Sequence, residues 1–159
     1  MGSIFDKIIM NAEEIKKCLP HRDPLLLIDV VHDLKLGESI IASKLLTKDD
    51  PVFRGHFPDN PVYPGVYYIE GIAQAGAILA FLTRNDKGIT EEKLGFLSSV
   101  DEARFRRPGS PNDKIRYEVA IEKMRGPFVW MKGKAYINDE IAAECKLSIA
   151  IAPKKGLNK

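Results

Sequence analysis

The sequence predicts an α+β protein in which a curved antiparallel sheet wraps around one long central helix. Two observations lead to this prediction. From Gly65 the chain runs for about 18 residues without a proline and is rich in Ala, Ile and Leu, far too long for a typical strand. On both sides of it lie segments whose apolar residues alternate with polar ones, the period of half-buried strands. A helix flanked in this way favours a layered α+β architecture.

Before the apolar run, the sequence predicts one short helix and one hairpin. We expect the helix at about residues 12–18, because the two prolines of LPHRDP then break the chain. The segments LLLIDVVHDL and SIIASKLLT predict two strands joined near Lys35 to Glu38. The Asp-Asp-Pro turn at residues 49 to 51 ends this hairpin.

The apolar run predicts a central helix at about residues 65–84. Pro64 stands where a helix start accepts proline, and Lys87 and Gly88 lie just past the expected end. The helix is apolar around most of its circumference, so it must be buried almost everywhere, and a homodimer is expected to cover part of it. Small residues keep it slim and allow strands or a second helix to approach closely: Gly71, Ala73, Ala75, Gly76, Ala77 and Ala80.

After the helix, residues 94–152 predict a meander of about four antiparallel strands. In IRYEVAIE the apolar side chains from Ile115 to Ile121 point one way and the charged ones the other, and the pattern returns from Cys145 to Ile151. Arg-Gly-Pro at 125 to 127 and Asn138-Asp139 supply the turns. A sheet wrapped around a single helix is the hot-dog shape, and one such domain is expected over residues 1–159.

Composition narrows the possible classes of function. The formal charge is +2, with 11 Lys and Arg against 14 Asp and Glu in residues 1–100 and 13 against 8 in residues 101–159. A mildly basic half is typical of a solvated sheet face and could also receive an acidic partner, but it is too sparse for a nucleic-acid binder. Cys18 and Cys145 have no metal-ligand spacing, and the start MGSIFDKII resembles no signal peptide, so a cytoplasmic protein is expected. Glu70 and Gln74 interrupt the apolar run and argue against a membrane span.

The stretch GHFPDNPVYPGVYYIEGIAQAG holds the candidate chemistry. His56 lies in a loop stiffened by prolines, and a backbone carbonyl near Val62 could fix its tautomer and make it a base. Glu70 and Gln74 share one helix face, so Gln74 can orient the carboxyl group. Gly65 begins the helix, where free N–H groups can receive an oxygen that gains negative charge.

Two interpretations of Glu70 remain open from the residues alone. A lone buried carboxylate usually has a raised pKa, which would leave a protonated Glu70 acting as a general acid. Alternatively, Glu70 is structural and pairs with Arg22 or Arg104. Neither His21 nor His32 has a setting in the sequence comparable to that of His56.

A base, an acid and an oxyanion site suit removal of the proton α to a thioester carbonyl with loss of a β-hydroxyl as water. This predicts dehydration of a 3-hydroxyacyl thioester. The chain has no H-E-x-x-H, C-x-x-C, G-x-S-x-G, Walker or G-x-G-x-x-G motif, so neither a metal nor another cofactor is expected.

Four blocks in order along the chain resemble the FabZ kind of 3-hydroxyacyl-acyl-carrier-protein dehydratases of bacterial type II fatty acid synthesis. They are LPHRDPLLLIDVV, GHFPDNPVYPGV, IEGIAQAG and FLSSVDEARFRRPGSPND. The family pattern H-F-P-x-x-P-x-x-P-G followed by E-x-x-A-Q falls on His56, Phe57, Pro58, Pro61, Pro64, Gly65, Glu70, Ala73 and Gln74.

This resemblance implies that His56 and Glu70 are catalytic and that Gly65, Val66 and Gln74 bind substrate. It implies a carrier protein that delivers the phosphopantetheine-linked acyl group, and sites shared between the subunits of a dimer, with three dimers in a hexamer. Glu70, where isomerising relatives carry Asp, implies the non-isomerising branch. The basic candidates for carrier-protein docking are Arg104, Arg106, Arg107, Lys123 and Arg125.

Two other functions compete with this interpretation. A hot-dog thioesterase would use a carboxylate and a helix N-terminus to hydrolyse the thioester, although His56 before the prolines argues against it. A non-catalytic acyl-thioester-binding protein would use the apolar tunnel that the resemblance implies along the dimer interface, without needing both His56 and Glu70.

Overall fold

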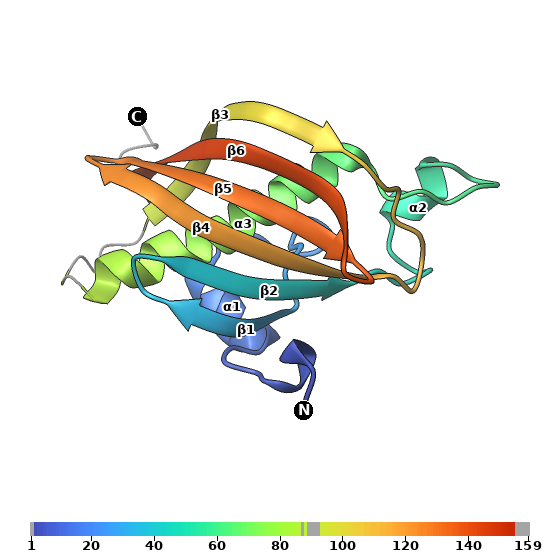
Figure 1. Ribbon diagram of the computed structural model, residues 1–159, viewed down its shortest axis with the longest axis horizontal. Helices are drawn as coiled ribbons and strands as arrows, with labels where there is room; N and C mark the ends of the chain where they lie inside the picture. Colours follow the sequence, from blue (N-terminus) through green and yellow to red (C-terminus); the bar gives the residue numbers. More distant parts are fainter. Residues whose placement is uncertain (1, 87, 89–92, 155–159) are drawn as a thin grey trace.

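The computed structural model describes residues 2–86, 88 and 93–154. Six antiparallel strands form one curved sheet, and the long helix α3 (Gly65–Asp86) lies along its inner face (Figure 1). This confirms the predicted α+β, hot-dog-like fold. The strands are β1 (Val30–Lys35), β2 (Ser39–Leu45), β3 (Lys93–Phe105), β4 (Lys114–Arg125), β5 (Phe128–Ile137) and β6 (Glu140–Pro153).

Three short helices complete the described chain. The 3-10 helix η1 (Ile4–Asp6) and α1 (Ala12–Cys18) precede the sheet, and α2 (Val52–Gly55) follows β2. Asn11 caps α1 in a reciprocal capping box with Glu14, which explains why this helix begins where it does. Gly88 follows α3 at φ +80°, as expected past a helix end, whereas Lys87 lies outside the described residues.

The order of strands in the sheet is β1-β2-β4-β5-β6-β3. The prediction of a four-strand meander is therefore wrong for β3, which pairs with β6 at the far edge instead of with β4. The connection at residues 106–113 is too long for a tight hairpin and lets the chain cross the end of the sheet, while β2 takes the place beside β4. The remaining hairpins are as expected, and both Asn138 and Asp139 have positive φ in the β5–β6 turn.

The inner face of the sheet packs against the small residues of α3. A Cβ at Gly71 would overlap the Tyr117 side chain, and a Cβ at Gly76 would overlap Met131. The close approach expected from these residues is thus confirmed. The alternation in β4 is confirmed as well, with Tyr117 and Val119 buried, although Ile121 is only half-buried beside a bulge.

The other side of α3 is covered by its own chain. Helix α1 contacts it, and the segment Leu25–Ile28 is tied to it by the side chain of Gln74. The helix is long and apolar enough to cross a membrane, but 72% of its apolar window is buried inside the protein, so it is the core helix. Within one chain α3 is thus already buried over most of its surface.

Candidate active site

His56 ends α2 and is held by three hydrogen bonds. Its backbone N–H donates to Val52 O over 3.1 Å, and its backbone carbonyl accepts from Val62 N over 2.8 Å. The ring nitrogen Nδ1 lies 2.7 Å from Val62 O, the carbonyl region expected from the sequence. Both the backbone and the imidazole of His56 are therefore fixed by the proline-rich loop.

The bond to Val62 sets the tautomer of His56. A carbonyl oxygen can only accept, so Nδ1 carries the proton and donates it. The other ring nitrogen, Nε2, then keeps its lone pair. His56 is half-buried, and this free nitrogen makes it a base that is already oriented.

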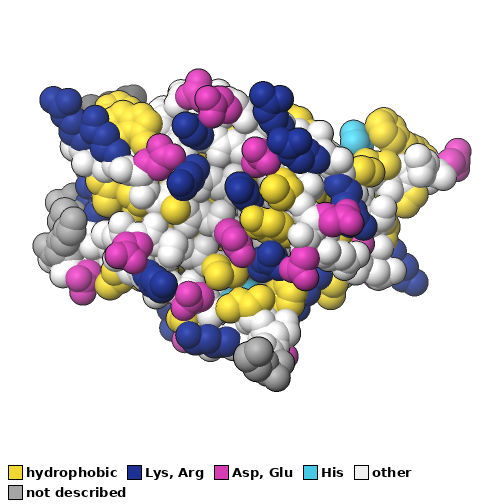
Figure 2. Space-filling model, in the orientation of Figure 1, with side chains coloured by type: hydrophobic (Ala, Val, Ile, Leu, Met, Phe, Trp, Pro, Cys, Tyr) yellow, Lys and Arg dark blue, Asp and Glu magenta, His cyan; other side chains and the backbone are white. Residues whose placement is uncertain are grey.

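The loop that carries His56 projects beyond the end of the sheet (Figure 1). Phe57 and Asn60 close its tip with reciprocal backbone bonds of 3.1 and 3.0 Å, and the bond from Tyr63 N to Gly109 O anchors its base. The Phe57 ring stacks on His56 with centroids 4.1 Å apart and is 51% exposed. Figure 2 shows hydrophobic side chains gathered on this projection.

Glu70 lies in the second turn of α3 and is half-buried. Gln74 Nε2 donates to Glu70 Oε1 over 2.9 Å, as the spacing of four residues predicts. His21 Nε2 lies 3.5 Å from the same oxygen, at the long limit for a hydrogen bond. Both contacts hold Oε1, so Oε2 is left without a partner among the described residues and can accept a hydrogen bond.

The pKa of Glu70 differs from the expectation. Burial raises it, but the hydrogen bonds from His21 and Gln74 and the charge of His21 outweigh burial, so the pKa lies below its ordinary value. The expected protonated carboxylic acid is therefore wrong for this chain. Glu70 is a carboxylate near neutral pH, and it accepts hydrogen bonds rather than donating one.

The side-chain amide of Gln74 makes three hydrogen bonds within the chain. Its Oε1 accepts from Leu27 N over 2.9 Å, and its Nε2 donates to Leu25 O over 2.8 Å as well as to Glu70. The side chain is only 1% exposed. Because both amide hydrogens are engaged and the side chain is buried, the structure gives no support to the expected contact of Gln74 with substrate, and the observed contact of Gln74 in the site is with Glu70.

Glu70 does not pair with either of the two arginines considered from the sequence. Arg22 instead donates to the carbonyls of Leu19, His21 and Lys16, and no contact joins Arg104 to Glu70. The actual neighbour is His21, for which the sequence suggested no setting like that of His56. The one signal in the sequence was its position in LPHRDP, a break where the chain must turn.

Gly65 is the first residue of α3, whose first N–H groups have no acceptor within the helix. A Cβ at Gly65 would lie 2.9 Å from the Phe105 ring, so any larger residue would require that ring to move. Val66 is 67% exposed at the same helix end. An oxygen placed at this N-terminus would meet free N–H donors beside an apolar surface.

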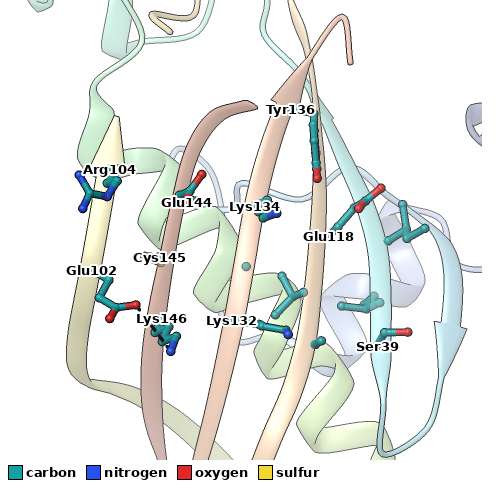
Figure 3. Close-up of a pocket in the computed structure, with 15 residues that line it drawn as sticks. Ser39, Glu102, Arg104, Glu118, Lys132, Lys134, Tyr136, Glu144, Cys145 and Lys146 are labelled. Atoms are coloured by element: carbon teal, nitrogen blue, oxygen red, sulfur yellow. Dashed lines mark ion pairs between the residues drawn. The ribbon is translucent and has the colours of Figure 1, made fainter. Parts of the chain in front are cut away.

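A cavity of about 650 Å³ lies elsewhere, on the outer face of the sheet. In Figure 3, Lys132 and Lys134 on β5 lie between Glu118 on β4 and Glu144 on β6. Two smaller cavities, of about 320 and 210 Å³, lie near the ends of α1 and α3 and beside Tyr63. None of the three is lined by the candidate residues His56, Gly65 or Glu70.

Within the described part of the chain, no group of three or more His, Cys, Asp or Glu side chains could hold a metal ion. His56 and Glu70 do not contact each other, although each is oriented within its own segment. Each of these two side chains is thus held by contacts that do not involve the other.

Comparison with known proteins groups the chain with dehydratases. Residues 19–146 match the FabA-like domain family. Proteins named 3-hydroxyacyl-[acyl-carrier-protein] dehydratase FabZ from Campylobacter fetus and Nitratiruptor are 45% and 43% identical, each aligned over 92% of this chain and 100% of the relative. Among solved structures, the dehydratase heterocomplex ApeI:P from Xenorhabdus doucetiae shares the fold, with a TM-score of 0.78, 17% identity and coverage of 91% of this chain and 97% of that chain.

Proposed function

The chain belongs to the FabA-like domain family and, within it, to the FabZ-type 3-hydroxyacyl-[acyl-carrier-protein] dehydratases, and from that membership we propose how its residues dehydrate a 3-hydroxyacyl thioester to the trans-2-enoyl thioester in fatty acid synthesis. The observation that carries the proposal is the 2.7 Å contact between His56 Nδ1 and Val62 O. It leaves the lone pair of Nε2 free and its direction fixed, as proton abstraction by this ring requires.

The reaction begins with the proton on C2 of the acyl chain. His56 Nε2 takes this proton, and the negative charge moves to the thioester oxygen. The free N–H groups at Gly65 stabilise that oxygen, and Val66 contacts the thioester end of the substrate. Because the donors are fixed before the reaction, they stabilise the charge without reorganising.

The bond from C3 to the hydroxyl then breaks. The Glu70 carboxylate accepts a hydrogen bond from this hydroxyl through Oε2 and holds it beside the imidazolium of His56. The proton taken from C2 passes from His56 to the departing oxygen, which leaves as water, and His56 returns to its neutral form. Glu70 remains ionised throughout, in keeping with its lowered pKa.

We assign each site to two subunits, with His56 from one and Glu70 from its mate. The two free edges of the sheet differ in a way that supports a dimer through β3. The β1 edge is covered by the N-terminal segment, since Ile9 and Met10 bond to Val31. Among the described residues no segment pairs with the outer edge of β3, which carries four apolar residues that are 40% to 53% exposed, namely Phe96, Leu97, Val100 and Phe105.

An unpaired edge strand with exposed apolar side chains is a template for a second strand. Phe105 also contacts Gly65, so an interface along β3 would reach the helix end where the thioester oxygen binds. The acyl chain would then run along this interface, which is consistent with the three cavities described above not being lined by His56 or Glu70. Three such dimers would form the hexamer.

The partner that delivers the substrate is the acyl carrier protein, and we place the enzyme in the cytoplasm. An acidic carrier protein is attracted most by basic side chains that are not already paired within the chain. Two of the five candidates are engaged within the chain, since Arg106 pairs with Glu144 and Arg107 with Glu140. Lys123 lies over the Trp130 ring. Arg104 and Arg125 are the remaining candidates for docking.

The test is an assay of the purified protein with a 3-hydroxyacyl thioester on its carrier, with the enoyl product and free thiol followed separately. Enoyl product without free thiol is expected. Free thiol would instead identify a thioesterase, and tight binding with neither product would identify an acyl-thioester-binding protein.

A further inference from the structure

The loop LPHRDP has no part in the reaction as described, yet it brings a second histidine to Glu70. His21 Nε2 lies 3.5 Å from Glu70 Oε1, and the His21 and Glu70 side chains are only 27% and 37% exposed. Arg22, the next residue, donates to three backbone carbonyls of the same segment, which holds this turn in place. His21 therefore has a fixed position beside the carboxylate.

The two nitrogens of the His21 ring have unequal surroundings. Its Nδ1 is buried and has no hydrogen-bond partner in the described part of the chain, whereas its Nε2 faces Glu70. His32 shows what a structural histidine looks like in this fold, because its Nδ1 contacts Lys7 O and its Nε2 contacts Ser43 Oγ, both at 2.7 Å. A ring placed to stabilise the fold would use both nitrogens. The polar contact that His21 makes is to Glu70.

His21 and Gln74 approach the same carboxylate oxygen from two elements. Gln74 reaches Oε1 from within α3, and His21 reaches it from the loop before β1. A single donor would let the carboxylate turn about it and exchange its oxygens. Two donors from different directions fix the plane of the group, so that Oε2 keeps one direction.

We propose that His21 is a positioning residue that, together with Gln74, holds the Glu70 carboxylate so that Oε2 receives the 3-hydroxyl of the substrate. This inference rests on the proposed function of Glu70. It predicts that the loss of His21 slows the chemical step and leaves substrate binding intact, because a displaced carboxylate no longer meets the departing hydroxyl.

The first test compares His21→Leu, which removes the donor, with His21→Gln, whose amide can still donate to Glu70. For His21→Leu we expect kcat to fall about 10- to 100-fold with KM within about twofold, the usual cost of a misplaced catalytic group. His21→Gln should recover most of this loss. Lys17→Gln, an exposed change on the neighbouring helix α1, is the matched control and should leave kcat unchanged.

The pH profile supplies a readout that a purely structural role would not move. Within the chain, His21 is the titratable group that acts on Glu70, since Gln74 is uncharged and Arg22 is turned to carbonyls. In the proposed dimer, His56 of the partner subunit faces Glu70 as well and is the same in every variant. Loss of His21 removes contacts that lower the Glu70 pKa, so the pH profile of the Glu70 carboxyl carbon signal in NMR should move to higher pH in His21→Leu.

A measurement that does not depend on catalysis keeps the inference testable even if a variant misfolds. The chain has three histidines, so their imidazole NMR signals can be assigned by substitution. Glu70→Gln should shift the His21 signal and leave that of His32 in place. An unchanged His21 signal, or a His21→Leu enzyme with wild-type kcat, would overturn the inference. A wild-type protein that forms no enoyl product would instead overturn the proposed function, while the NMR result would still decide whether His21 contacts Glu70.

Discussion

His56 owes its orientation to short-range structure. The carbonyl that fixes its ring belongs to Val62, six residues later, and the same residue donates its N–H to the His56 carbonyl. Three prolines between His56 and Gly65 limit how this short loop can close. Local geometry of this kind keeps Nε2 available whether or not substrate is present.

Replacement of this base gives the most direct prediction for a single residue. His56→Ala should lower kcat/KM at least about a hundredfold, the usual scale for a general base, while thermal unfolding and oligomer size remain as in the wild type. Steady-state assay, calorimetry and light scattering would measure these. Arg54→Ala, an exposed change in the same helix α2, is the control. Activity that persists in His56→Ala would show that another group takes the C2 proton.

The sequence predicted the site contacts between residues that lie close together along the chain. It missed the contact between residues that lie far apart along the chain. The His56–Val62 and Glu70–Gln74 contacts follow from loop closure and helical spacing. His21 meets Glu70 only because the fold brings a loop from the N-terminal region against α3, and no periodicity encodes that approach. The pKa of Glu70 was mispredicted for the same reason, since burial was visible in the sequence and the added donor was not.

Strand β1 is joined to the N-terminal segment by a buried histidine. His32 is 1% exposed, its ring contacts Lys7 O and Ser43 Oγ, and the Phe5 ring meets it edge-on with centroids 5.4 Å apart. Burial lowers its pKa, and the charge of Lys114 acts in the same direction although the contact with Lys7 O opposes it. The folded protein therefore favours neutral His32.

This shift predicts how stability depends on pH. Above the ordinary pKa of 6.5 both folded and unfolded chains hold His32 neutral, so its contribution is complete. As pH falls below that value, the unfolded chain takes up the proton first, and stability is lost until pH passes the folded pKa. Urea unfolding at about pH 7.5 and about pH 5.5 should show a smaller decrease in His32→Gln than in the wild type. Equal decreases in the two proteins would rule out His32 as the source.

The contact between α3 and the sheet depends on glycines that face large side chains. Gly71→Ala should lower the free energy of unfolding by about 1–3 kcal/mol, because its Cβ would overlap the buried Tyr117 ring, even though alanine favours the helix by roughly 1 kcal/mol. Gly55→Ala, where nothing lies within 4 Å of the added Cβ, is the matched control. Urea denaturation of the two variants measures the difference, and a Gly71→Ala protein as stable as the wild type would contradict this packing.

Secondary structure was more predictable than strand order. The alternation of β4 and β6 and the uninterrupted apolar run of α3 each identify an element through a period in the sequence. No period distinguishes a β3 that pairs with β4 from one that crosses to β6, because either neighbour offers the same ladder of N–H and C=O groups. The strand order depends on the insertion of β2 beside β4. This insertion involves the packing of the whole sheet and not the sequence of one strand.

The outer face of the sheet and its β3 edge differ in the environment that they suggest. The outer face mixes charges of both signs, with Lys134 opposite Glu118 on one side and Glu144 on the other (Figure 2). A charged surface of this kind is well solvated. The bare β3 edge, with its exposed apolar side chains, is the part of the molecule that gains most from a second copy.

Sites shared across that edge make a prediction that no single-chain site would meet. His56→Ala and Glu70→Gln dimers are each expected to be inactive, but a mixed dimer has one site with both His56 and Glu70 intact. After random exchange of equal amounts, half of the dimers are mixed and about a quarter of the wild-type activity should return. Mass spectrometry would verify the exchange, and no recovery after verified exchange would argue that each subunit holds its own site. In the control, wild type mixed with the double variant should lose activity only if sites are shared, because each mixed dimer then has two incomplete sites.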